Sequence, residues 1–229
     1  MIHTILLDLD NTLLDFSKAE RIALSNTLKQ LGIEPDEHIL SRYSELNLAQ
    51  WKLLEQGKIS RNEVKLRRYR LLFDEYKIDC SAEEAARIYE NMLGMGHYFI
   101  DGAEKLLKEL QEQYSLYIVT NGTKSVQTGR IKSAALEKYF QGIFISEDIG
   151  FNKPSREFFE RCFSGIPDFE KESTVIVGDS LTSDILGGIN AGIKTIWFNP
   201  EHKINNSDIL PDYEIALLNE LIPLLDALK

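Results

Sequence analysis

The sequence predicts an α/β protein in which a doubly wound parallel sheet is interrupted, after its first strand, by an all-helical insert. Two observations predict this class. Short apolar, β-rich runs alternate with helical stretches between residues 101 and 179, which is typical of a parallel sheet. Between about residues 17 and 97 several amphipathic patterns occur without any convincing strand. With 229 residues, 43% of them hydrophobic, the chain can bury such a core and an inserted domain.

Five apolar runs are the expected strands; four of them are strong, and the third in chain order is weak. They cover residues 2–9, 115–120, 142–146, 174–179 and 193–198. The insert is expected to hold four helices, separated by breakers such as Gly32 and Gly57, at residues 17–31, 37–56, 60–77 and 82–96. Open α/β sheets bind ligands at the carboxyl ends of their strands, so an insert placed there is expected to cover the site as a lid. The predicted domains are therefore a core of residues 1–15 and 98–229 and a cap of residues 16–97.

Composition and charge exclude several classes of protein. The 26 basic and 36 acidic side chains give a net charge of −10 without a long block of Lys and Arg, so neither polymeric nucleic acid nor a membrane is an expected partner. Cys80 and Cys162 lie too far apart to suggest a disulfide framework or a zinc site. No signal peptide and no apolar run of about 18 residues is evident, which predicts a cytoplasmic protein. The oligomeric state is left open.

The first predicted strand ends in the run DLDNT, residues 8–12, so that two carboxylates emerge together from apolar surroundings. Like charges side by side are costly unless a cation compensates them, and oxygen ligands suit Mg²⁺. The alternative is that Asp10 and Thr12 only cap the loop.

Two further runs supply groups for an anion. Thr120 and Asn121 stand where a strand gives way to a helix, a turn whose N–H groups favour anions. An ordinary turn with Gly122 at positive φ is the alternative. Lys153 follows the weak strand and precedes Pro154; the alternative for this lysine is a solvated surface charge.

The run GDSLTSDILGG, residues 178–188, carries two more carboxylates. Asp179 ends a very apolar strand and needs a cation there, whereas Asp184 could simply cap the following helix. Because the carboxyl ends of parallel strands meet in one crevice, Asp8, Asp10 and Asp179 are expected to meet there around a cation, facing groups suited to an anion. Those are the two halves of a phosphoryl-transfer site.

In this combination the sequence resembles the haloacid dehalogenase superfamily, in the group with a helical cap after the first motif. The matching motifs are DLDNT at 8–12, TNG at 120–122, KP at 153–154 and GDSLTSD at 178–184. The further run GGINAGIKTIWFN, residues 187–199, resembles the pyrimidine 5′-nucleotidase branch. The resemblance implies a Rossmann-like core.

The resemblance also implies a role for each motif residue. Asp8 would be the nucleophile and, with the backbone carbonyl of Asp10 and the carboxylate of Asp179, a magnesium ligand. Asp10 would serve as general acid and then as base. The phosphoryl oxygens would be bound by Thr120, Asn121 and Lys153. Supporting roles would fall to Thr12 and Asp184. Asp184 would orient Lys153 or a metal-bound water.

Asp10 favours phosphate chemistry, because the dehalogenases that named the superfamily attack carbon and lack this second aspartate. The expected function is a magnesium-dependent phosphatase for a small phosphorylated metabolite, with pyrimidine nucleoside monophosphates as the best guess. A phosphomutase of the β-phosphoglucomutase type and a non-enzymatic, receiver-like phosphate-sensing module are the alternatives. Cap or hinge contacts to the substrate are expected from four residues, Trp51, Lys52, His97 and Tyr98, and hinge movement from Gly94, Gly96 and residues 15–17.

Overall fold

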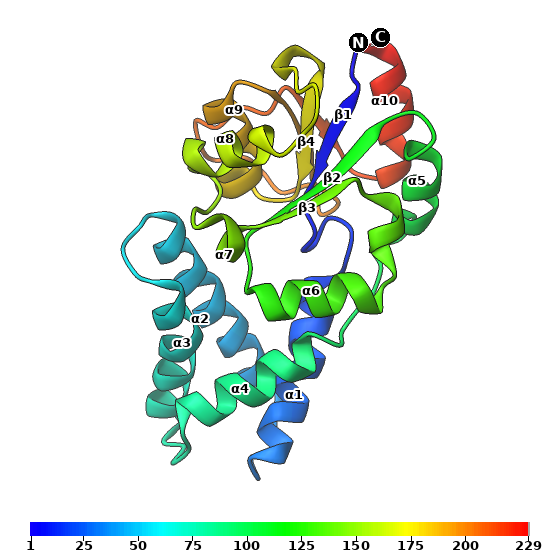
Figure 1. Ribbon diagram of the computed structural model, residues 1–229. Coiled ribbons are helices and arrows are strands. Elements are labelled where there is room, and N and C mark those ends of the chain that lie inside the picture. Colours follow the sequence, from blue (N-terminus) through cyan, green and yellow to red (C-terminus); the bar gives the residue numbers. More distant parts are fainter. Residues whose placement is uncertain (229) are drawn as a thin grey trace.

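The computed structural model describes residues 1–228 and confirms the predicted α/β class with a helical cap (Figure 1). Six parallel strands form one sheet in the order β3-β2-β1-β4-β5-β6. The strands are β1 Thr4–Leu7, β2 Ser115–Thr120, β3 Gly142–Ile145, β4 Thr174–Gly178, β5 Lys194–Phe198 and β6 Tyr213–Ile215. Five of these correspond to predicted runs. The sixth was missed, because Tyr-Glu-Ile is too short and too polar at its centre to give an apolar signal.

Helices cover both faces of the sheet, and four more form the cap. The cap helices are α1 Phe16–Gln30, α2 Glu37–Glu55, α3 Arg61–Tyr76 and α4 Ala82–Leu93. The core helices are α5 Ala103–Leu110, α6 Lys124–Ser133, α7 Ser146–Ile149, α8 Arg156–Ser164, α9 Leu186–Ala191 and α10 Leu221–Ala227. No helix within residues 1–228 has the length and apolar character needed to cross a membrane.

The alternation of side chains along β1 shows why the sheet is buried on both faces. Ile5 and Leu7 pack into one apolar cluster with α5 and α10, whereas Leu6 packs into another with α8 and α9. Figure 1 shows these helix pairs on opposite sides of the sheet. Successive strands lie on opposite sides of β1, with β2 and β3 on one side and β4, β5 and β6 on the other. Such a reversal of strand order is a topological switch point, and the crevice expected there lies at the carboxyl end of β1.

The cap has its own apolar core, and each of its helices begins at a side-chain cap. The caps are Asp15, Asp36, Ser60 and Ser81, each accepting a hydrogen bond from the backbone N–H three residues on. The fourth helix ends at Leu93, three residues earlier than predicted, and Gly94 follows it as the C-cap.

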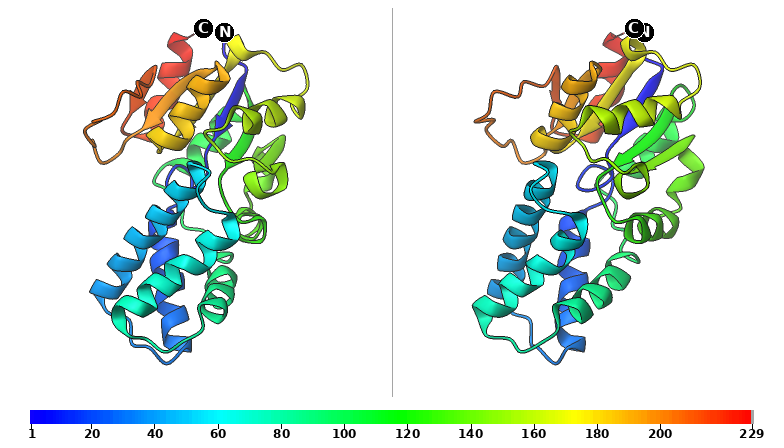
Figure 2. Two further views of the ribbon diagram at one scale, coloured as in Figure 1. Left: turned by 90° about the vertical axis from the view of Figure 1, so that its left-hand side faces the viewer. Right: turned by 60° about the vertical axis from the view of Figure 1, so that its left-hand side comes forward.

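Two antiparallel connecting segments join the cap to the core. Asp15 N–H donates to the Tyr98 carbonyl at 2.7 Å, and Ile100 N–H donates to the Leu13 carbonyl at 3.0 Å. Both views in Figure 2 place the cap helices beyond the end of the sheet that lies opposite the two termini. The cap therefore stands over the carboxyl ends of the strands.

Candidate functional site

Asp8 lies at the carboxyl end of β1 and is almost fully buried. Its N–H continues the ladder to β4 by donating to the Val177 carbonyl at 3.0 Å. One carboxylate oxygen accepts a hydrogen bond from Lys153 Nζ at 2.6 Å, and the other accepts one from the Thr12 hydroxyl at 3.3 Å. Thr12 therefore contacts the Asp8 side chain directly and does more than cap the loop.

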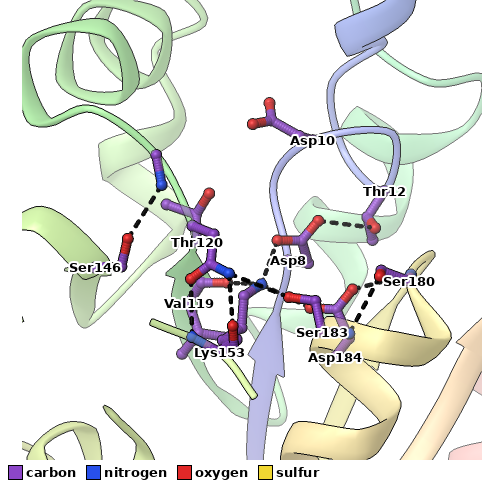
Figure 3. Close-up of polar contacts among 12 residues, drawn as sticks. Asp8, Asp10, Thr12, Val119, Thr120, Ser146, Lys153, Ser180, Ser183 and Asp184 are labelled. Carbon is purple, nitrogen blue, oxygen red and sulfur yellow. Dashed lines mark hydrogen bonds and ion pairs between the residues drawn. The ribbon is translucent and has the colours of Figure 1, made fainter. Parts of the chain in front are cut away.

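Lys153 is buried, with 1% of its surface exposed, so it is not a solvated surface charge. Its ammonium group donates to Asp8 Oδ1 and Asp184 Oδ1, both at 2.6 Å, and to the Val119 carbonyl at 2.8 Å (Figure 3). An ammonium group has three donors, so all are used. Lys153 thus ties β1, β2 and the segment after β4 together at one point.

Asp184 faces this lysine from the π-helical turn at Leu181–Ile185, which precedes α9. Its second oxygen accepts a hydrogen bond from Ser180 N–H at 3.1 Å. The close approach of the Asp184 side chain to the end of β4 requires glycine at residue 178, because a Cβ there would lie 2.3 Å from the Asp184 carboxyl carbon. Further along, a Cβ on Gly188 would lie 2.6 Å from the side chains of Ile176 and Thr195, which explains how this segment packs closely on the sheet.

The carboxylates of Asp8, Asp179 and Asp184 form an oxygen cluster that fits a hard dication. One oxygen from each lies within 4.8 Å of the others. Burial, opposed by Lys153, raises the pKa of Asp8 to about 7, and burial together with the Asp8 charge raises the pKa of Asp179 well above its usual value. Three carboxylates face one ammonium group, so a cation such as Mg²⁺ would stabilise their ionised forms.

Asp10 lies two residues beyond Asp8 but points away from it (Figure 3). One of its oxygens pairs with the guanidinium of Arg130, and the other accepts a hydrogen bond from Gln127 Nε2 at 2.8 Å. Arg130 is fully buried and also donates to the Gly96 carbonyl at 3.0 Å, in the segment that returns from the cap. Helix α6 thus links Asp10 to this connecting segment.

Thr120 is the last residue of β2 and Asn121 follows it, and their side chains make different contacts. The Thr120 hydroxyl is buried and accepts a hydrogen bond from Gln127 at 2.8 Å. The Asn121 amide pairs with the main chain of Lys153 in both directions, each at 2.9 Å. Asn121 therefore positions the lysine segment through its side chain. Gly122 is not among the described glycines with positive φ, so the simple turn alternative is wrong.

A cavity of about 560 Å³ connects these groups with the cap. Trp51 and Lys52 line it, as expected of cap residues that contact a ligand. His97 and Tyr98 do not: His97 is exposed and contacts Met95 and Ser133, and Tyr98 lies under the Lys18 ammonium. Both belong to the connecting segment, which passes outside the cavity.

Arg61, the first residue of α3, joins the cap to the core beside the cavity. Its guanidinium donates to the Gly122 carbonyl at 2.6 Å, to the Ser146 hydroxyl at 2.7 Å and to Asn152 Oδ1 at 2.5 Å. A second cap contact runs from the Thr182 hydroxyl to a Glu55 carboxylate oxygen at 3.3 Å. The cap therefore rests on the segments that follow three core strands.

Sequence reasoning missed Arg61, Gln127 and Arg130. Each stands in a helical pattern where charged and amide side chains ordinarily mark a solvated face. Their spacing offers one weak signal, because Gln127 and Arg130 are three residues apart and so share one face of α6.

Comparison with known proteins identifies the family. The family profile described as haloacid dehalogenase-like hydrolase matches residues 5–198. The pyrimidine 5′-nucleotidase PynA of Streptococcus pneumoniae is 41% identical, over 97% of this chain and 94% of its own length. The pyrimidine 5′-nucleotidase YjjG of Escherichia coli is 35% identical over 55% of this chain and 56% of its own.

A solved structure matches almost the whole fold. The protein named HAD-hydrolase YfnB of Bacillus subtilis, in a crystal form bound to magnesium that reveals interdomain movement, is 41% identical and superposes with a TM-score of 0.94. The match covers 98% of this chain and 99% of the other. Because the profile matches residues 5–198 and both PynA and YfnB match nearly the whole sequence, the chain belongs to the haloacid dehalogenase-like hydrolases.

Proposed function

We propose that the chain is a magnesium-dependent phosphatase that moves the phosphoryl group of small phosphomonoesters onto Asp8 and then hydrolyses the aspartyl phosphate. The observation that carries the proposal is the cluster of three carboxylates, two of them paired with the buried Lys153, which opens into a cavity beneath the cap. Pyrimidine nucleoside 5′-monophosphates are the proposed substrates, on the similarity to PynA and YjjG.

In the first step, an Asp8 oxygen forms a bond to phosphorus while the ester oxygen leaves with a proton from Asp10. In the second, a water attacks phosphorus, Asp10 takes its proton, the bond to Asp8 breaks and inorganic phosphate leaves. Asp10 must turn from Arg130 and Gln127 toward Asp8 for either transfer. Such proton transfer contributes about two to four powers of ten in rate.

The other site residues would bind the phosphoryl group and Mg²⁺ or keep Asp8 and Lys153 in position. Lys153 and the Thr120 hydroxyl would bind phosphoryl oxygens, and Asn121 would contribute its main-chain N–H while its amide fixes Lys153. Mg²⁺ would be held by the Asp8 and Asp179 carboxylates and the Asp10 carbonyl, where it would neutralise charge on the phosphoryl group. Thr12 and Asp184 would keep Asp8 and Lys153 in place.

We place the working boundaries of the cap at residues 16 and 97, where the two connecting segments pair. A cap that moves about these segments would admit small substrates and, when closed, exclude bulk water while leaving room for the attacking water. The contacts of Arg61 with the core would hold the closed position.

Phosphate release tests the proposal. The chain with Mg²⁺ should release inorganic phosphate from p-nitrophenyl phosphate and from pyrimidine nucleoside monophosphates, and EDTA should stop this until Mg²⁺ is restored. Full activity in EDTA would contradict the magnesium role. Transfer of phosphate to a sugar phosphate instead of water would indicate a phosphomutase, and slow stoichiometric self-phosphorylation without turnover would indicate a receiver-like module.

A further inference from the structure

The cavity has more room than a phosphate group and a metal ion require. The end of the cavity away from Asp8 lies inside the cap. Between the two ends its walls include the apolar side chains of Phe16, Trp51 and Leu93. The far end is polar: Glu20, Ser44, Asn47, Arg68 and Tyr89, here called the cap polar cluster, all line the cavity. A mostly apolar pocket with a few convergent polar groups is the usual form of a small-molecule site.

The charged members of the cap polar cluster are buried and connected. Glu20 and Arg68 are each 4% exposed. The Glu20 carboxylate accepts hydrogen bonds from Asn47 Nδ2 at 2.6 Å and from the Ser44 hydroxyl. Asn47 Oδ1 in turn accepts one from Arg68 Nη1 at 2.8 Å. Asn47 therefore holds a carboxylate and a guanidinium side by side at the end of the cavity.

Hydrogen-bonding capacity remains unused in this cluster. Arg68 Nε donates to the Lys65 carbonyl, but Nη2 donates to no residue within 1–228. The Tyr89 hydroxyl, on a side chain with no exposed surface, also lacks a partner among these residues. A carboxylate can accept about four hydrogen bonds, and Glu20 accepts two. Buried polar groups left unpaired are costly, so such groups facing a cavity point to a ligand.

We infer that the cap polar cluster binds the polar edge of a pyrimidine base, with Arg68 Nη2 donating to a ring carbonyl and Glu20 accepting from the neighbouring N–H. The inference rests on the proposed function, which places the phosphate of the same molecule at Asp8. A uracil edge carries an N–H between two carbonyls, and a cytosine edge an amino group beside ring acceptors. Both complement a carboxylate next to a guanidinium. The apolar walls then face the ring and the ribose.

The test compares a ligand that has a base with one that lacks it. Uridine 5′-monophosphate and ribose 5-phosphate share the phosphate and the ribose, so the ratio of their kcat/KM values reports the base alone. Arg68→Met should lower this ratio about 10- to 100-fold, since a hydrogen bond from a charged donor is lost. Tyr89→Phe should lower it about threefold to tenfold. The control Arg70→Met alters an exposed arginine two residues further along α3 and should keep the wild-type ratio.

Tyr89→Phe separates recognition from support of the fold, because the Tyr89 hydroxyl makes no hydrogen bond of normal length and angle with a described residue. The Tyr89→Phe variant still tests base recognition if Arg68→Met fails to fold. A ratio unchanged in every variant that folds would overturn the inference, as would an equal loss with Arg70→Met.

A binding measurement keeps this inference separate from the proposed function. Calorimetry with Asp8→Asn and Mg²⁺ requires no turnover and should show tighter binding of uridine 5′-monophosphate than of ribose 5-phosphate. Arg68→Met should reduce that preference in the same background. Equal binding of the two ligands by Asp8→Asn would refute the base site even in an active phosphatase. A retained preference in a chain that releases no phosphate would refute only the proposed function.

Discussion

The core end and the cap end of the cavity bury charge in opposite ways. At the core end every donor of Lys153 is used, yet three carboxylates face that single cation, so what is missing is positive charge. At the cap end Glu20 and Arg68 balance each other in charge, and what is missing is hydrogen-bond partners. This difference supports the proposals that a metal and a phosphate bind at the core end and a neutral polar ring at the cap end.

The largest expected effect concerns the core end. Asp8→Asn removes the proposed nucleophile and should lower kcat for p-nitrophenyl phosphate about a thousandfold or more. Release of free phosphate is the measurement. Asp74→Asn, which alters an exposed aspartate at the end of α3, is the matched control and should behave like the wild type. Substantial phosphate release by Asp8→Asn would remove Asp8 from the chemistry.

An intermediate effect should follow the loss of the buried cation that pairs with Asp8 and Asp184. Lys153→Met leaves Asp8 and Asp184 without their partner, and breaking a buried pair in this way costs about 3–5 kcal/mol of unfolding free energy. Urea denaturation without Mg²⁺ measures it, with Lys132→Met at an exposed position as the control. Added Mg²⁺ should recover part of the loss by supplying positive charge. An unchanged urea midpoint would show that Lys153 does not stabilise the carboxylates.

The smallest effect concerns the cap end and depends on pH. Burial raises the pKa of Glu20 above its ordinary value of 4.5, although Ser44 and Asn47 oppose the shift by donating hydrogen bonds. As the pH rises above 4.5, the folded state holds more protons on Glu20 than the unfolded state does. The contribution of this group to the unfolding free energy therefore falls as the pH rises. Glu20→Gln removes the contribution, and its Tm should decline less than that of the wild type as the pH rises above 4.5.

Glu45→Gln, at an exposed position of α2, controls for the loss of one negative charge. A Tm that declines equally in Glu20→Gln and the wild type would mean that Glu20 does not titrate differently on folding. The cap end would then differ from the core end in burial but not in proton binding.

The family and the core of the fold could be predicted from the sequence because both depend on local signals. Apolar β-rich runs mark β1, β2, β4 and β5, and the polar residues after them must share an edge once the strands are parallel. The structure brings Asp8, Lys153, Asp179 and Asp184 together at that edge. Tyr213–Ile215 was too short to give such a signal, and it pairs only because β5 offers it an edge.

Contacts between helices could not be predicted, because they depend on how each helix is rotated and how the cap is set on the core. The side-chain amide of Asn121 pairs with the main chain of Lys153, a contact that no sequence pattern indicated. Arg130 and Arg68 look like ordinary charged helix residues in the sequence, and packing alone buries one against Asp10 and the other beside Asn47. The common direction of the parallel strands fixes which end of the sheet carries the chemistry, whereas side chains from separate helices meet only after the chain has closed around the cavity.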